Sequence, residues 1–117
     1  MNSEETVLVS PSRGGMDLVV RRRLNNTDKF QEQQVLSKHD MIVNSVIMDQ
    51  EYLVSGGWDC RVVFWKWDHD SSGQYQYSED VKLDSYINTM CSYHNHDDQR
   101  IYFVGGKKGY IAKINTL

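Results

Sequence analysis

The stretch from Tyr52 to Trp67, YLVSGGWDCRVVFWKW, constrains the fold more than any other part of the chain. It contains two apolar runs of strand length, rich in Val, Phe and Trp, on either side of a Gly-Gly-Trp-Asp-Cys segment. β-Branched and aromatic residues favour strands, and paired glycines between two such runs favour a tight turn. The stretch therefore predicts a β-hairpin with a buried face, in which the glycines adopt the positive φ of a turn.

The hairpin pattern recurs along the chain. The segment 53–57 has a counterpart in 102–106, 49 positions later, and a weaker one around Leu8, Val9 and Ser10, 45 positions before Ser55. These spacings are close to the period of roughly 40–45 residues that is typical of a four-stranded propeller blade. No stretch shows a sustained helical period. The pattern therefore indicates a β-repeat architecture.

The segments between the hairpins supply the remaining strands. Each is of strand length, rich in β-branched or aromatic residues, and bounded by Asp, Ser, Asn or Gly. We therefore predict an all-β fold of antiparallel four-stranded blades, amounting to about two and a half blades of a propeller. The predicted units are a half blade over residues 5–24, a blade over 30–67 and a degenerate blade over 75–116, and the added strands cover 30–36, 42–48, 75–83 and 86–93.

The predicted array is incomplete. A closed propeller has about 4–8 blades, and an open array leaves strand edges unpaired, which proteins usually avoid. We expect the chain to be a piece of a longer propeller. Self-assembly, completion by a partner chain and an open sheet array remain as alternatives.

Four residues around the central hairpin carry a family resemblance. His39, Ser55, Asp59 and Trp65 follow one another at steps of 16, 4 and 6. They resemble a repeat of the WD-repeat (tryptophan–aspartate repeat) family of β-propellers, in which a His, a Ser or Thr, an Asp and a Trp form one structural hydrogen-bond network. The resemblance implies that the four side chains satisfy one another, since each buried polar group left unpaired would cost about 1–3 kcal/mol.

The resemblance is uneven along the chain. Lys38 stands where the family has a Gly before the His, and in the last unit Lys108 and Ile114 replace the Asp and the Trp. The first unit has an Arg13-Gly14-Gly15 turn without an Asp. Of the three units, only the unit over 30–67 therefore carries the network.

The blade pattern also predicts a shared rim. In an up-and-down blade, the turns between the second and third strands and the links into each first strand emerge at one end, so residues 11–16, 37–41, 56–60 and 105–109 should meet there. Trp and Arg are enriched among interface anchors, and function concentrates in loops on rigid scaffolds. We therefore predict a WD-repeat-type protein-interaction scaffold whose candidate partner-binding residues are Arg13, Met41, Trp58, Lys107 and Lys108. The sequence leaves open a second role for Trp58, packing over its own turn.

One segment has metal-ligand residue types. His94–Asp98 contains two histidines and two aspartates, and Cys91 is nearby. Their spacing matches no structural zinc pattern, and the segment falls between a first and a second strand, where polar turn residues are expected. We therefore predict a solvated turn, with no metal and no cofactor.

His39, Ser55 and Asp59 are also the residue types of a hydrolytic triad. The structural network that the resemblance implies accounts for all three without catalysis. No other nucleophile and base recur at a suggestive spacing. We therefore predict that the chain is not an enzyme.

The alternative function is a module that binds nucleic acid or phosphoinositide. It would use the basic residues Arg21–Arg23, Lys107 and Lys108. Side chains alternate along a strand, so Arg22 should point away from Arg21 and Arg23, and the three cannot form one cationic face. The net charge of −3 provides no bulk attraction to nucleic acid. We therefore expect other proteins as partners.

The chain has two cysteines, Cys60 and Cys91, far apart in sequence. Its start, MNSEETVLVS, lacks the basic and apolar regions of a secretory signal, and no apolar run is long enough to span a membrane. We therefore expect two buried free thiols and an intracellular location, cytoplasmic or nuclear.

Overall fold

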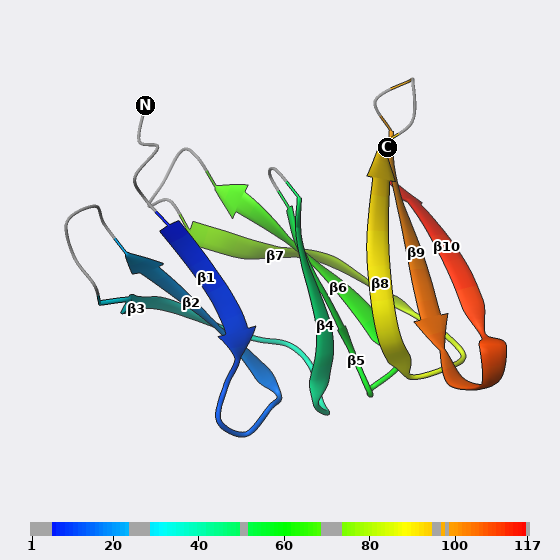
Figure 1. Cartoon of the computed structure of the whole chain (residues 1–117), viewed down its shortest axis with the longest axis horizontal. Coiled ribbons are helices and arrows are strands. Elements are labelled where there is room, and N and C mark those ends of the chain that lie inside the picture. The colour runs from blue at the N-terminus through cyan, green and yellow to red at the C-terminus, as the bar shows by residue number, and fades with distance from the viewer. Residues whose placement is uncertain are drawn as a thin grey trace.

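The computed structural model describes residues 6–23, 29–49, 52–68, 74–94, 97 and 99–116. These residues form ten β-strands and one short 3-10 turn (Figure 1). Every strand pair is antiparallel, which confirms the predicted all-β, antiparallel fold. The strands are β1 (Thr6–Pro11), β2 (Asp17–Arg23), β3 (Gln31–Ser37), β4 (Val43–Asp49), β5 (Tyr52–Gly57), β6 (Arg61–Asp68), β7 (Gln74–Lys82), β8 (Ile87–His94), β9 (Arg100–Gly106) and β10 (Ile111–Thr116), and the turn η1 covers Lys107–Gly109.

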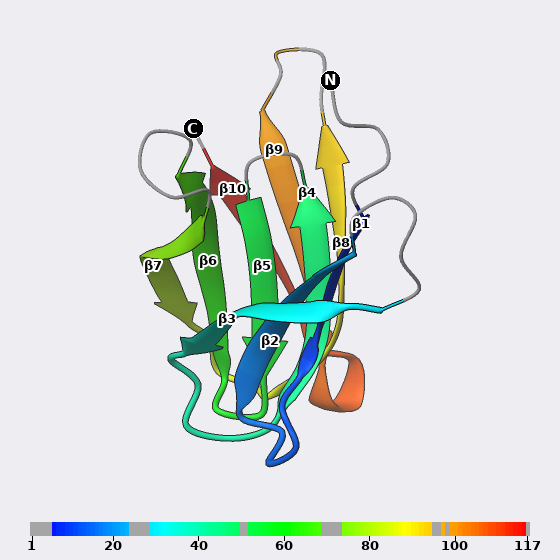
Figure 2. The ribbon, with the colours of Figure 1, turned by 90° about the vertical axis from the view of Figure 1, so that its left-hand side faces the viewer.

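The strands form three sheets, each of which runs up and down in chain order. Sheet A contains β1–β3, sheet B contains β4–β7, and sheet C contains β8–β10. Sheet B lies between the other two (Figures 1 and 2). Among the described residues, the three sheets do not close into a ring.

The sheets group the strands differently from the units at 30–67 and 75–116. β3 pairs with β2 rather than β4, and β7 pairs with β6 rather than β8. The links over residues 38–42 and 83–86 carry the chain across to the next sheet instead of folding it back as a hairpin. Sheets B and C therefore each begin one strand later than the predicted units at 30–67 and 75–116.

The two middle strands of sheet B, β5 and β6, are buried on both faces. Four consecutive residues of β6, Val62–Trp65, are buried, because alternate side chains enter two different cores. A strand covered on both faces has a continuous apolar sequence, which explains why the central hairpin lacks polar alternation. The core between sheets A and B contains Leu18, Val20, Leu36, Val43, Leu53, Val63, Trp65 and Tyr75. The core between sheets B and C contains Val54, Val62, Phe64, Ile87, Met90, Tyr102 and Val104.

The glycine pairs at 56–57 and 105–106 do not form the turns, contrary to the prediction. They end β5 and β9, and the positive φ values fall instead at Cys60 and at Lys108 and Gly109. Close packing explains Gly57: a Cβ there would come within 2.8 Å of both His39 Nδ1 and Asp59 Oδ1. This glycine therefore makes room for the polar side chains beside it.

Candidate interaction surface

The structure joins the four residues of the implied network in one chain of hydrogen bonds. The Trp65 indole nitrogen lies 3.1 Å from Ser55 Oγ, and that oxygen lies 2.8 Å from His39 Nε2. His39 Nδ1 lies 3.1 and 3.0 Å from the two carboxylate oxygens of Asp59. The four residues come from the link before β4, from β5, from the turn after it, and from β6. The network therefore fastens that link and that turn to the middle of sheet B.

The donors and acceptors of this chain of hydrogen bonds match one another. The indole N–H can only donate, so the Ser55 oxygen accepts from Trp65. The hydroxyl hydrogen is then free to donate to His39 Nε2, while Nδ1 donates its hydrogen to Asp59. With the imidazole hydrogen on Nδ1, each of the four side chains therefore has a hydrogen-bond partner within the chain.

The Asp59 carboxylate also organises the surrounding backbone. One oxygen accepts the main-chain N–H of Arg61 at 3.2 Å, and the other accepts that of Asp40 at 2.9 Å. Ser55 is fully buried, and the side chains of His39 and Asp59 are almost so. Their polar atoms face one another rather than a cleft, so the arrangement holds loops in place and offers no open nucleophile.

The predicted rim segments lie at one end of the three sheets (Figure 1). Hydrogen bonds fasten these segments to the links between the sheets. Val43 N donates to Gly15 O at 2.7 Å, and Trp58 N donates to Ile42 O at 2.9 Å. Farther along, the N–H of Lys107 donates to the side chain of Ser85 in the link between sheets B and C. The rim is therefore a fixed surface that crosses all three sheets.

The rim exposes apolar side chains at its middle. Trp58 is 43 % exposed and Met41 is 48 % exposed. The Trp58 ring contacts Tyr86, which precedes β8, with centroids 6.0 Å apart, so it leans toward sheet C and does not simply cover its own turn. Met16 and Ile42 are exposed beside them; the sequence analysis missed both, although each falls in or next to a rim segment.

The predicted cations lie toward the two ends of the same rim. Arg13 belongs to the β1–β2 turn of sheet A, while Lys107 and Lys108 form the β9–β10 turn of sheet C, and all three are exposed. Trp58 lies between them on the β5–β6 turn of sheet B. The rim thus presents exposed apolar side chains in its middle, with the exposed carboxylate of Asp40 beside Met41, and positive charge toward both ends.

The arginines of the alternative function contact their own chain. Arg21 donates to the Ser10 hydroxyl at 3.1 Å, and the Arg22 guanidinium lies over the Trp67 ring at 4.7 Å. Arg23 lies over the ring of Phe30 at 5.6 Å. All three are half-buried. Arg21–Arg23 therefore do not present one open cationic face.

A second polar cluster joins sheets B and C, and the sequence analysis did not find it. Asp49, at the end of β4, accepts a hydrogen bond from the Tyr102 hydroxyl at 3.2 Å and lies 3.4 Å from Arg100 Nε. Burial, and after it the Asp49 carboxylate, raises the pKa of Tyr102 well above its ordinary value. No local signal could reveal this cluster, since 53 positions separate Asp49 from Tyr102.

The predicted solvated turn lies partly outside the described residues, which include His94 and Asp97 but not His96 or Asp98. His94 Nε2 accepts a hydrogen bond from Arg100 Nε at 3.2 Å. Within the described part of the chain, no group of three potential metal ligands comes together.

Both cysteines are free thiols. Cys60 is half-buried and Cys91 is exposed, so the expectation of two buried thiols was wrong. Cys91 lies on the side of β8 that faces away from sheet B, where nothing in the sequence distinguished it from a core position. A membrane-crossing helix is absent from the described segments, whose helical structure is the single turn η1.

Comparison with known proteins adds no family assignment. A scan against protein-family models gives no match. A search of curated protein sequences gives none either.

Proposed function

We propose that the chain is part of a WD-repeat-type β-propeller and acts as an intracellular protein-interaction scaffold within a multiprotein complex. The observation that carries the proposal is Trp58, a half-exposed indole on a turn that a buried polar network holds in place. A side chain presented in this way loses little conformational freedom on binding, and aromatic residues of this kind dominate interface energetics.

Two features support the WD-repeat type in particular. The complete four-stranded sheet is the one that contains the His39–Ser55–Asp59–Trp65 chain of hydrogen bonds. The sheets before and after it have the same antiparallel order and pack on its two faces. This is the arrangement expected of consecutive blades.

The charges on the rim indicate the chemistry of the partner. An apolar middle at Met41 and Trp58, with Arg13 on one side and Lys107 and Lys108 on the other, complements a segment that has apolar residues flanked by acids. The cations lie in exposed turns, so their contribution should fall as salt screens it.

Affinity capture from a cell extract, followed by quantitative mass spectrometry, tests the proposal. We expect a defined set of proteins to be retained by the wild-type chain and lost with Trp58→Ala. Phe30→Ala is a matched control, because Phe30 is an aromatic residue of similar exposure, 38 %, that lies outside the rim segments. Equal retention by the Trp58 variant would refute the binding role, and so would loss of its folded far-UV circular dichroism spectrum, since Trp58 would then be a folding residue.

A further inference from the structure

Two links between the sheets each bring an aspartate to the rim beside the β5–β6 turn. Asp40 lies in the link before β4, and its main-chain N–H donates to the Asp59 carboxylate of the turn at 2.9 Å. Asp84 lies in the link before β8, next to Leu83, whose N–H donates to Cys60 O of the same turn at 2.7 Å. The backbone of both aspartates is therefore fixed close to the turn.

Both carboxylates are open to a further ligand. The Asp40 side chain is 74 % exposed, and Arg61 Nη1 lies 3.8 Å from it, which is too long for a hydrogen bond. The same nitrogen lies 3.9 Å from Asp80, so Arg61 is shared between two acids. Asp84 is also exposed. Within the described part of the chain, neither Asp40 nor Asp84 accepts a hydrogen bond at its carboxylate.

Trp58 lies between these two links and contacts both. Its main-chain N–H donates to Ile42 O of the first link at 2.9 Å. Its ring contacts Tyr86 of the second link, with the two ring planes inclined at 32°, and the indole is still half-exposed. Met41, the residue after Asp40, is exposed as well. The middle of the rim therefore combines an open aromatic face, an aliphatic side chain and two ionised side chains.

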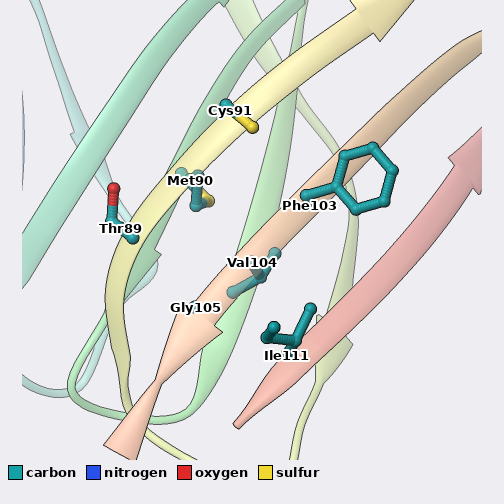
Figure 3. Close-up of a pocket in the computed structure, with 7 residues that line it drawn as sticks. All are labelled: Thr89, Met90, Cys91, Phe103, Val104, Gly105 and Ile111. Atoms are coloured by element: carbon teal, nitrogen blue, oxygen red, sulfur yellow. The ribbon is translucent and has the colours of Figure 1, made fainter. Parts of the chain in front are cut away.

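The hollow on the outward face of sheet C has a different character. It has a volume of about 200 Å³, and the residues that line it, among them Phe103, Cys91 and Ile111, carry no charge (Figure 3). An apolar ligand would meet no ionised group there. On the rim, an apolar side chain laid over Trp58 would displace water from the two carboxylates without giving them a partner, which is unfavourable. The rim therefore requires a ligand that stacks on the indole and carries positive charge.

We propose that the middle of the rim binds an arginine side chain of the partner protein. The guanidinium stacks on the open face of the Trp58 indole and pairs with the carboxylates of Asp40 and Asp84, while the aliphatic stem lies against Met41. The inference rests on the proposed function, and it adds the residue that the partner places at the centre of the rim.

Arginine meets these requirements better than lysine. Its guanidinium is planar, stacks on aromatic faces and carries five N–H donors, whereas the lysine ammonium is a compact and strongly hydrated point charge. The stem of arginine covers apolar surface while its charged end stays with the acids. The acidic residues of the partner then lie before and after this arginine, where they face Arg13 at one end of the rim and Lys107 and Lys108 at the other.

Selection from a library of random linear peptides tests the inference, because it assumes no partner sequence. Peptides displayed on phage are selected on the wild-type chain and counter-selected on Trp58→Ala. We expect the peptides that depend on Trp58 to share one arginine with acidic residues around it. A shared aliphatic or aromatic residue in its place would overturn the inference and leave binding through Trp58 intact. If no peptide depended on Trp58, the proposed function itself would be refuted, and the inference with it.

A thermodynamic cycle then identifies the groups that hold the arginine. In a selected peptide, the arginine is replaced by citrulline, which keeps the shape of the side chain and removes its charge, and the affinity is measured by calorimetry. On the wild-type chain we expect a loss of about tenfold or more. On a chain that carries both Asp40→Asn and Asp84→Asn, the same replacement should change the affinity by less than about threefold. Both aspartates are exposed, so these changes should leave the chain folded.

Glu79→Gln and Phe103→Ala are the matched controls. Glu79 is an exposed acid on strand β7 outside the rim segments, and Phe103 is the exposed ring beside the hollow of sheet C. Both control chains should show the full loss of affinity with the citrulline peptide. An equally large loss on the chain with Asp40→Asn and Asp84→Asn would overturn the inference, because other groups would then hold the arginine.

Discussion

Removal of the Ser55 hydroxyl should destabilise the protein far more than the small size of this group suggests. The hydroxyl accepts the indole N–H of Trp65 and donates to His39 Nε2, and Ser55 is fully buried. Ser55→Ala therefore leaves one buried donor and one buried acceptor without a partner. Each such group costs about 1–3 kcal/mol, so we expect a loss of roughly 2–6 kcal/mol in the free energy of unfolding.

That loss is a large part of the total stability of a small domain, about 5–15 kcal/mol. Urea unfolding followed by circular dichroism measures it directly. Ser92→Ala is the control, because Ser92 is an exposed serine on strand β8, and such a change usually costs within about 0.5 kcal/mol. If Ser55→Ala cost no more than this control, the reasoning from unsatisfied buried groups would be refuted.

A double-mutant cycle measures the contribution of the hydrogen bond between Trp65 and Ser55. Trp65→Phe removes the indole donor but leaves Ser55 bonded to His39. In the chain that carries both changes no indole N–H is left unpaired, so the combined loss should be smaller than the sum of the two single losses. Strict additivity would mean that the bond between Trp65 and Ser55 contributes nothing.

Two further predictions concern close packing and pH. Gly57→Ala should lower the free energy of unfolding by about 1–3 kcal/mol, because the added Cβ would crowd His39 and Asp59. Gly14→Ala is the control and should cost much less, because the space around Gly14 is open. Comparable urea midpoints for the two variants would contradict this prediction. Because the pKa of Tyr102 is raised, the folded chain holds the proton of this hydroxyl more tightly than the unfolded chain does. The stability that this difference contributes is complete below about pH 10 and is lost as the pH rises through the raised pKa. Tyr102→Phe should therefore flatten the alkaline loss of stability, and an unchanged alkaline profile would show that another group causes it.

Much of the strand pattern could be predicted from the sequence, because it depends on local composition. The hairpin over Tyr52–Trp67 and the strands on either side of it are present, and residue type with turn punctuation was enough to place them. The residues of the network could be named because the resemblance fixed their order, and the structure shows their hydrogen bonds.

The features that escaped prediction depend on contacts between distant segments. β3 and β7 have polar faces that do not reveal which neighbouring sheet they join. The role of Gly57 is set by His39 and Asp59, which approach from outside its own strand. The bond between Asp49 and Tyr102 joins two sheets that are separated in sequence. The periodicity of a sequence carries no information about contacts between distant segments.

The protonation of His39 is the most direct test of the central claim, that a buried polar network holds the rim in place. Long-range proton–nitrogen NMR spectra distinguish the two ring nitrogens of a histidine, and hydrogen exchange reports on the Trp65 indole. We predict that the His39 hydrogen lies on Nδ1, where it faces Asp59, and that the indole N–H is strongly protected. A hydrogen on Nε2, or an indole N–H that exchanges as fast as that of exposed Trp58, would contradict the network and the fixed rim that depends on it.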